Sequence, residues 1–167
     1  MHTAVCGVTK TGKSYFCKTL ARQYKAQGQF RTLCYDPIGD DEWKGIVDFY
    51  TTDKAEFLDV YYGSTNCRAF FEECGDLNRH KDVGFEMSAR RGRHWGHYNF
   101  YISQQWQKIP PGIRSQCSRV YSFRQGREDA KLLAAAFGNE DLKEVSNLDK
   151  GEYIAATAFS AETHKLF

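Results

Sequence analysis

Near its N-terminus the chain carries the stretch Gly7-Val8-Thr9-Lys10-Thr11-Gly12-Lys13-Ser14, which matches the pattern GxxxxGK[ST] without a gap. Gly7 and Gly12 allow backbone conformations in which the loop curls and turns its N–H groups inward, toward a bound anion. Lys13 can reach the β- and γ-phosphates of a nucleotide, and the hydroxyl of Ser14 can bind Mg²⁺. The stretch therefore predicts a phosphate-binding loop (P-loop) that holds a nucleoside triphosphate.

The segments on either side of this loop have the character that the motif requires. Residues 3–7 form a short apolar run that predicts a buried strand. Residues 14–27 predict a helix, because Phe16, Leu20 and Tyr24 recur four apart and a glycine follows the last turn. The positive end of that helix's dipole would point at the phosphates, which favours anion binding.

Further along the chain, predicted strands alternate with predicted helices. This alternation is typical of a mainly parallel sheet with helices on both faces. We therefore expect a three-layer α/β fold of the P-loop NTPase kind with a C-terminal β-hairpin; the RecA-like (ASCE) type is implied by the family resemblance that the further motifs carry. The predicted strands are 31–36, 47–50, 67–73, 97–103 and 119–123, the predicted helices are 54–62, 82–95, 109–117 and 128–137, and the hairpin pairs 152–158 with 162–167.

Length and composition restrict the class of protein. At 167 residues the chain is expected to form one P-loop ATPase domain over residues 1–167, with a full hydrophobic core. No apolar run approaches the roughly 18 residues that a membrane span needs, and no secretory signal is visible at the N-terminus. The 6 cysteines form no CxxC pair, so we expect buried or incidental free thiols. The aromatic content of 15% argues against disorder.

The formal net charge of +2 conceals a segregation of charge along the chain. Residues 36–60 carry eight acidic and two basic side chains, whereas residues 79–131 carry eleven basic and four acidic ones. Such a segregation is typical of a protein with one surface that meets polyanions. An ion-paired surface within the folded chain would give the same pattern, and composition does not separate the two.

Two acidic residues follow the apolar run 69–71. Glu72 and Glu73 would lie at the carboxyl end of a strand that neighbours the first one, at the sheet edge where ligands collect. We expect Glu72 to contribute to the Mg²⁺ shell and Glu73 to polarise the attacking water. An ordinary solvent-exposed strand end is the alternative. The predicted strand 97–103 is followed by Gln104, whose amide could sense the γ-phosphate or orient the water.

The sequence Arg90-Arg91-Gly92-Arg93-His94 precedes that strand. An arginine supplied by a neighbouring subunit can neutralise the charge that develops in the transition state of nucleotide hydrolysis. The same side chains could instead bind the phosphates of a nucleic acid, or form a solvated helix end that the helix dipole favours. Arg90, Arg91 and Arg93 are therefore candidates for catalysis in trans, with the two other roles open.

These motifs occur in a fixed order, and in that order the sequence resembles the FtsK/HerA superfamily of ring-forming, DNA-pumping ATPases. It looks most like the small genome-packaging ATPases of tailless, often membrane-containing viruses, over about residues 3–137. It departs from the family pattern at Glu72, where the family usually has Asp. The motifs are the P-loop at 7–14, Phe-Phe-Glu-Glu-Cys-Gly-Asp-Leu at 70–77, Ala-Arg-Arg-Gly-Arg-His-Trp-Gly-His-Tyr at 89–98, Ile-Ser-Gln-Gln at 102–105 and Pro-Pro-Gly-Ile-Arg-Ser-Gln-Cys at 110–117.

The resemblance implies an Mg²⁺-dependent ATPase that moves double-stranded DNA, without reading its sequence, into a preformed viral capsid. It implies a ring of identical subunits, with six as the expected number, that meets capsid portal or vertex proteins in the host-cell cytoplasm or the virion. Glu73 matches the family's catalytic acid, Gln104 matches its polar sensor, and Arg114 is a further candidate arginine. The residues expected to bind ATP are Gly7, Val8, Thr9, Lys10, Thr11, Gly12, Lys13, Ser14 and Tyr15, with Ser14 and Glu72 on the Mg²⁺ ion.

Two other functions are compatible with the motifs. A motor for phage assembly or secretion shares the superfamily, although such motors usually carry a transmembrane segment. A P-loop nucleotide or small-molecule kinase would fit the length. A kinase usually needs an arginine-rich lid that closes over the phosphate donor, and the region after residue 105 is the candidate for that lid.

Overall fold

The computed structural model describes residues 2–75 and 83–167 of the chain. Its strands are β1 (His2–Cys6), β2 (Arg31–Tyr35), β3 (Phe49–Thr51), β4 (Cys67–Phe71), β5 (Tyr98–Ser103), β6 (Cys117–Ser122), β7 (Glu152–Ala156) and β8 (Ala161–Lys165). Its helices are α1 (Lys13–Gln27), α2 (Lys54–Tyr62), α3 (Val83–Arg91), α4 (Pro111–Arg114) and α5 (Arg127–Phe137). The 3₁₀ segments within the described residues are Asp41–Trp43, Gly92–Trp95, Trp106–Lys108 and Glu140–Ser146.

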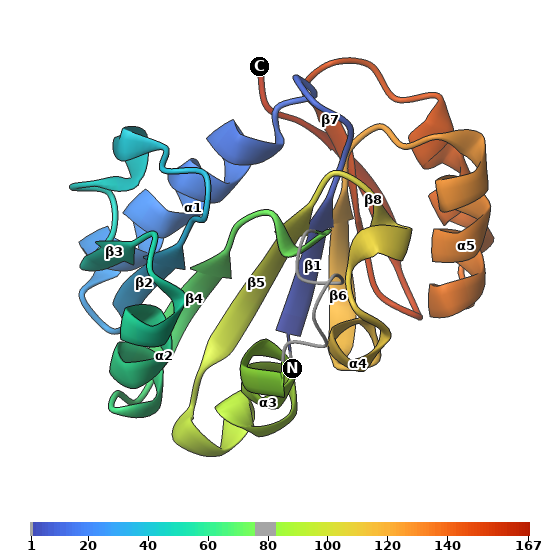
Figure 1. The fold of residues 1–167 in the computed structure, drawn as a ribbon. Helices are drawn as coiled ribbons and strands as arrows, with labels where there is room; N and C mark the ends of the chain where they lie inside the picture. Colours follow the sequence, from blue (N-terminus) through green and yellow to red (C-terminus); the bar gives the residue numbers. More distant parts are fainter. Residues whose placement is uncertain (1, 76–82) are drawn as a thin grey trace.

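The strands form one eight-stranded sheet in the order β3-β2-β4-β5-β1-β6-β7-β8 (Figure 1). All neighbouring strands from β3 to β6 are parallel, and β7 and β8 extend the sheet as an antiparallel hairpin. The central strand β1 is buried over its whole length, including His2 and Thr3. This burial on both faces explains why the strand has no alternation of polar and apolar residues.

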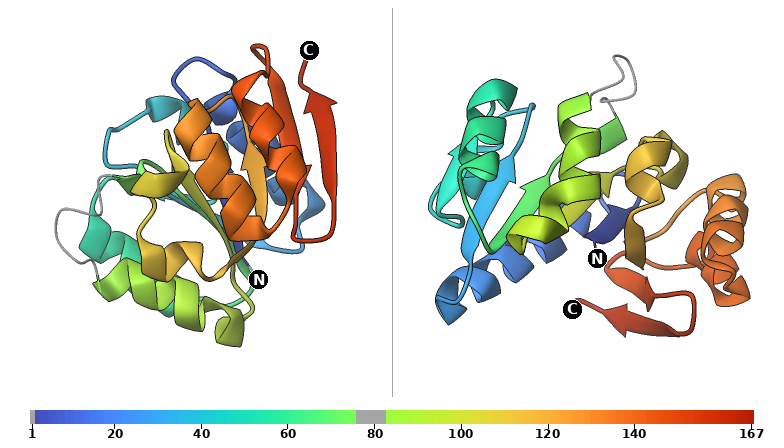
Figure 2. Two further views of the ribbon diagram at one scale, coloured as in Figure 1. Left: turned by 90° about the vertical axis from the view of Figure 1, so that its right-hand side faces the viewer. Right: turned by 90° about the horizontal axis from the view of Figure 1, so that it is seen from below.

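Helices cover both faces of the sheet, and the right-hand view of Figure 2 separates the layers. On one face α1 packs through Phe16, Cys17 and Ala21 against strand residues such as Phe70 and Phe100. The rings of Phe70 and Phe100 stack with their centroids 4.7 Å apart. The hairpin β7–β8 borders the same face, next to α1.

The opposite face carries the other helices. Phe57 of α2 and Phe85 of α3 pack around Phe71 of β4, while Leu133 of α5 belongs to the same apolar cluster. The three-layer α/β fold with a mainly parallel sheet and a C-terminal hairpin is therefore confirmed. In the described residues, no helix is both long and apolar enough to cross a membrane.

The position of the acidic strand needs a correction. The strand before Glu72 and Glu73 is β4, and it does not pair with β1, because β5 lies between them. The two acids are therefore two strand positions from the P-loop strand, roughly 10 Å across the sheet. The alternation of strands and helices does not predict the pairing order, since a crossover helix can return its strand at more than one place.

Several element boundaries differ from the predicted ones for local reasons. The helix predicted over 82–95 ends at Arg91, and a 3₁₀ turn follows, because Gly92 packs so closely that a Cβ there would lie 2.2 Å from the hydroxyl oxygen of Tyr61. Residue 82 lies outside the described part of the chain. The helix predicted over 109–117 is only Pro111–Arg114, since Cys117 already pairs with β1 and begins β6.

Candidate nucleotide-binding site

The P-loop joins β1 to α1 at the C-terminal edge of the sheet, at the top of Figure 1. The ends of the two flanking strands hold its start: the N–H of Gly7 donates to the carbonyl of Ser103 at 3.2 Å, and that of Val8 to the carbonyl of Arg124 at 3.0 Å. A Cβ at Gly7 would lie 2.6 Å from the Cβ of Phe123. Only glycine fits there, so the first motif glycine lets the loop pass close to the end of β6.

The far end of the loop leaves the start of α1 open to an anion. Gly12 adopts φ 111°, and in the described part of the chain no side chain caps this helix and no acidic residue stands in its first turn. Lys13 is only 8% exposed and makes no ion pair with any residue that the structure describes. The helix dipole and the Lys13 ammonium group therefore combine into an uncompensated positive site, as a phosphate requires.

Glu73 and Gln104 lie together beside this loop. The Nε2 atom of Gln104 donates to Oε1 of Glu73 at 3.5 Å, which is long for a hydrogen bond. Both line a cavity of about 530 Å³ together with Lys13 and Ser14. The backbone at Glu73 has φ 48°, a left-handed conformation that ends the extended strand just before its side chain enters the cavity. The predicted site residues from β4 and β5 thus meet those of the P-loop.

Glu72 occupies a different environment from Glu73. It is 7% exposed, and its N–H donates to the carbonyl of Tyr35 at 2.9 Å, which continues the pairing of β4 with β2. Burial raises the pKa of its carboxyl to about 7; Lys13 opposes this shift, and Asp36 adds to it. Glu72 is therefore not the solvent-exposed strand end that the sequence left open, and it is not among the residues that line the cavity.

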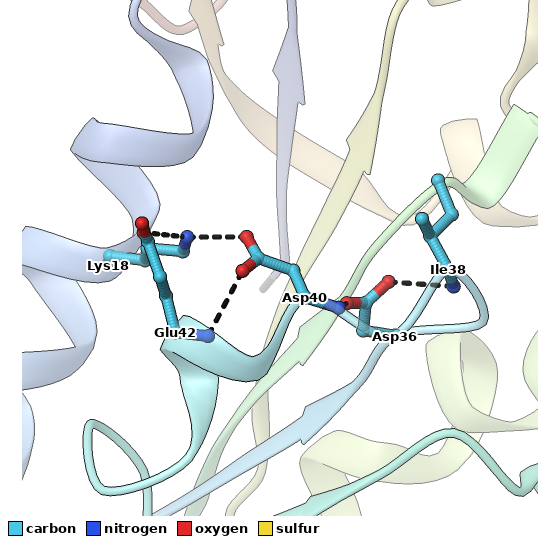
Figure 3. A network of polar contacts seen from close by, with 5 residues as sticks. All are labelled: Lys18, Asp36, Ile38, Asp40 and Glu42. Atoms are coloured by element: carbon cyan, nitrogen blue, oxygen red, sulfur yellow. Dashed lines mark hydrogen bonds and ion pairs between the residues drawn. The ribbon is translucent and has the colours of Figure 1, made fainter.

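A network of charged groups fastens the segment after β2 to α1 (Figure 3). Nζ of Lys18 lies 2.5 Å from Oδ2 of Asp40 and 2.6 Å from Oε2 of Glu42. The buried carboxylate of Asp36 accepts from the backbone N–H groups of Ile38 at 3.0 Å and Asp40 at 2.6 Å. Burial alone would lower the pKa of Lys18, but its hydrogen bonds with Asp40 and Glu42 raise it. Part of the acidic segment 36–60 is thus ion-paired within the chain.

The candidate arginines lie away from this site. Arg90, Arg91 and Arg93 are exposed at the end of α3 and in the turn after it. That end of α3 contacts the start of β1, where Nε2 of His2 lies 2.9 Å from the carbonyl of Ala89. Figure 1 shows α3 at the edge of the sheet opposite the P-loop. Within one chain these arginines do not reach the P-loop cavity.

Arg114 is also outside that cavity. It ends α4, its guanidinium lies 5.7 Å from the centroid of the Trp106 ring, and it lines a second cavity beside α5. The basic side chains at positions 79 and 81 lie outside the described residues. The structure therefore separates every described candidate arginine from the nucleotide site of its own chain.

Two residues of the C-terminal segment were not expected at the site. Lys150 and Phe167 line the P-loop cavity on the side of the hairpin. The N–H of Gly151 donates to the carbonyl of Thr11 at 2.9 Å, so the end of the chain is bonded to the loop itself. No sequence pattern predicts this contact, because it joins segments that lie about 140 residues apart.

Comparisons with known proteins give similarity at the level of the fold. No protein-family model and no curated protein matches the sequence. Among solved structures, the DNA-packaging ATPase B204 from Sulfolobus turreted icosahedral virus is similar, with a TM-score of 0.81, 13% identity, and coverage of 99% of this chain and 97% of that chain.

Two other solved structures, the EccC cytoplasmic domain and VirB4, are also similar to this chain. The cytoplasmic domain of the type VII secretion ATPase EccC of Thermomonospora curvata has a TM-score of 0.73 at 17% identity, covering 98% of this chain and 25% of that chain. VirB4 of Thermoanaerobacter pseudethanolicus has a TM-score of 0.74 at 9% identity, covering 99% of this chain and 89% of that chain. The resemblance seen in the sequence is thereby confirmed at the level of the fold: this chain has the same P-loop ATPase fold as B204, the EccC cytoplasmic domain and VirB4.

Proposed function

We propose that this protein is an Mg²⁺-dependent ATPase that drives double-stranded DNA into a preformed viral capsid and works as a ring. The observation that carries the proposal is the cavity in which Glu73 and Gln104 face Lys13 and Ser14. These four residues occur in a fold that matches the packaging ATPase B204 over 99% of this chain. B204 from Sulfolobus turreted icosahedral virus 2, which has the same fold, is known in complex with ATP-gammaS, which supports a nucleoside triphosphate as the ligand.

The residues of the cavity have the chemistry that ATP hydrolysis needs. Lys13 and the first N–H groups of α1 hold the β- and γ-phosphates, since the first turn of this helix carries no acidic residue. Glu73 accepts a proton from the attacking water, and Gln104, already within 3.5 Å of that carboxylate, orients the water or senses the γ-phosphate.

The donor set also fits a magnesium ion bound with the nucleotide. Ser14 presents its hydroxyl to the cavity at the exposed start of α1, and Glu72, a buried carboxyl behind that cavity with Lys13 as an electrostatic neighbour, would be the acidic ligand. A pKa of about 7 means that Glu72 holds a proton part of the time near neutrality, and a nearby cation would displace that proton. When bound, Mg²⁺ supplies positive charge to the β- and γ-phosphate oxygens.

A ring would supply the missing arginine. The P-loop and the arginines Arg90, Arg91 and Arg93 lie at opposite edges of one sheet. In a ring, successive subunits contact each other through two different surfaces, so the arginine-bearing edge of one subunit can face the cavity of the next. An arginine that acts in trans stabilises transition-state charge by a factor of order 10³–10⁵ in other NTPases.

The proposal is tested by DNA-dependent ATPase and filter-binding assays. We expect double-stranded DNA of any sequence to stimulate ATP turnover, and DNA retention to fall steeply with salt, because phosphate contacts release counterions. Lys13→Ala, which removes the phosphate-binding ammonium, is the control and should abolish turnover. Hydrolysis that ignores DNA, without salt-sensitive DNA binding, would contradict DNA translocation.

A secretion or conjugation motor is the second candidate, favoured by the similarity to EccC and to the conjugation coupling protein TcpA. A secretion motor would hydrolyse ATP with the same residues but respond to a protein substrate and not to DNA. A nucleotide kinase is distinguished by product analysis: incubation with nucleoside monophosphates would yield phosphorylated acceptor together with ADP, where a motor yields free phosphate.

A further inference from the structure

Two exposed aromatic side chains are among the residues that line the P-loop cavity. Tyr15, the residue after the P-loop, is 56% exposed, and Phe167 is 67% exposed. Their ring centroids lie 6.4 Å apart at an interplanar angle of 74°, so the rings meet edge to face. This arrangement forms an aromatic corner, defined by Tyr15 and Phe167, rather than a slot between parallel rings.

The chain holds this corner in place by backbone contacts. The N–H of Gly151 donates to the carbonyl of Thr11 at 2.9 Å, and the N–H of Leu166 donates to the carbonyl of Gly151 at 2.9 Å. Gly151 adopts φ 85°, and a Cβ on it would lie 2.8 Å from the ring of Phe167. The ring therefore packs on bare backbone that is itself bonded to the P-loop, which fixes it relative to the phosphate site.

The order of strands gives the cavity two different ends. β5 and β4, which lead into Gln104 and Glu73, lie on one side of β1, whereas β6, β7 and β8 lie on the other. The γ-phosphate must lie toward Glu73, because the water that attacks it is activated there. A nucleotide whose phosphates lie on the P-loop then extends its base toward the hairpin, where the aromatic corner stands.

We propose that the aromatic corner of Tyr15 and Phe167 is the subsite for the nucleotide base, and that it takes a purine ring by stacking. The inference rests on the proposed nucleotide function and adds to it the group that recognises the base. Apolar ring surface left exposed in the mouth of a polar phosphate site is suited to a flat aromatic ligand. Lys150, which lines the same end of the cavity, adds a cationic donor beside the base or its sugar.

The test compares a ligand that has a base with one that has none. Binding of AMPPCP and of inorganic tripolyphosphate, each with Mg²⁺, is measured by calorimetry on the wild type and on Phe167→Ala. Base–aromatic stacking corresponds to roughly 5- to 150-fold in affinity. We expect Phe167→Ala to lower the affinity for AMPPCP by a factor in that range and to leave the affinity for tripolyphosphate within two-fold of the wild-type value. Tyr15→Ala should behave in the same way, and Phe167→Trp should retain AMPPCP binding.

The hairpin offers a matched control in Phe159, which is 98% exposed in the turn between β7 and β8. Phe159→Ala removes an equally large ring from the same hairpin and should change neither affinity. If Phe167→Ala binds AMPPCP as the wild type does, while Lys13→Ala has lost it, the base subsite is refuted and the nucleotide function stands. If the wild type binds neither ligand, the nucleotide function itself is refuted, and the base subsite with it.

Discussion

At the scale of single residues, two adjacent glutamates of the same strand end have acquired different properties. Glu73 is half-buried, lines the P-loop cavity and contacts Gln104, whereas Glu72 is enclosed beside Lys13 with a pKa of about 7. The difference arises because the N–H of Glu72 still pairs with the carbonyl of Tyr35, whereas the backbone turns at Glu73, where φ is 48°. One of them meets the cavity and the other meets the interior. We therefore assign the reaction with water to Glu73.

Glu73→Gln should bind ATP with wild-type affinity and fail to hydrolyse it, since the amide keeps the shape but cannot accept a proton. We expect turnover to fall by a factor of about 10²–10⁴, the contribution typical of a general base. Single-turnover hydrolysis and nucleotide binding measured on the same sample separate the two effects. Glu72→Gln is the comparator: if it alone blocks hydrolysis while Glu73→Gln remains active, the two roles are exchanged.

The buried carboxyl of Glu72 should also make stability depend on pH. Its pKa is about 7 in the folded chain against 4.5 for the free side chain, so the folded state binds the proton more tightly. Stability from Glu72 is therefore greatest below pH 4.5 and is lost as the pH rises to 7. The full loss is about 3.5 kcal/mol, because the shift from 4.5 to about 7 is 2.5 pKa units and each unit corresponds to about 1.4 kcal/mol.

The measurement is the difference in unfolding free energy between wild type and Glu72→Gln, by urea titration at pH 5 and pH 8. The wild type should lose about 2–3 kcal/mol relative to the variant between these values. Burial lowers the pKa of His2 to about 4 and also lowers that of His97, and both have the opposite effect, losing stability as the pH falls. They are present in both proteins and cancel in the difference. A pH-independent difference would contradict the buried, proton-binding state of Glu72.

At the scale of elements, the loops at the C-terminal edge are held by long-range contacts rather than by their own sequence. The start of the P-loop is bonded to the ends of β5 and β6, and its last turn to Gly151 before β7. On the other side, Lys18 of α1 ties down the segment after β2 through Asp40 and Glu42. Helix α1 therefore carries Ser14 of the phosphate site and, four residues later on the next turn, Lys18. We call Lys18 with its partners Asp40 and Glu42 the brace.

Removal of the brace should destabilise the fold moderately. Lys18→Met keeps the buried stem but loses two charge-assisted hydrogen bonds, whose acceptors Asp40 and Glu42 are 43% and 76% exposed. Solvent screens these partners, so we expect a loss of about 1–2 kcal/mol in unfolding free energy. The control is Lys44→Met, which removes an exposed pair with Asp41 and should cost less than about 0.5 kcal/mol. Equal losses in the two variants would show that burial of Lys18 adds nothing.

At the scale of the whole molecule, the phosphate site and the candidate arginines lie at opposite ends of the strands of the sheet. Its C-terminal edge holds the phosphate site, and its opposite edge holds Arg90, Arg91 and Arg93. Lys13, by contrast, stands without an ion-pair partner among the residues that the structure describes. A single chain thus contains the parts of the proposed site without bringing them together, which is the arrangement expected of a subunit that completes its neighbour's site.

The trans arrangement predicts complementation between two inactive variants. Lys13→Ala lacks a working P-loop but keeps the arginines, whereas the triple variant Arg90→Ala, Arg91→Ala, Arg93→Ala keeps the P-loop. The triple variant alone should lose a factor of order 10³–10⁵ in turnover if one of its arginines is the trans group. In mixed rings, confirmed by light scattering with AMPPCP, some intact P-loops face intact arginines, and part of the activity should return. Mixed rings without recovery would contradict a trans role for these three residues and leave Arg114 as the candidate.

The sequence by itself determined the phosphate loop, the alternation of strands and helices, and the pair Glu72–Glu73. It could do so because each of these is a local pattern: the spacing of two glycines, the period of apolar residues, and acids after an apolar run. Gln104 was found in the same way, as the residue after a strand. The single-domain boundary 1–167 and the individual site roles stay predictions.

Only the tertiary structure decided the rest. It placed β5 between β1 and β4, buried Glu72 while leaving Glu73 in the cavity, and moved the arginines to the far edge. It also brought Phe167 to the P-loop. These outcomes depend on strand order and on contacts between distant segments, which the packing of the whole sheet sets and no local pattern encodes.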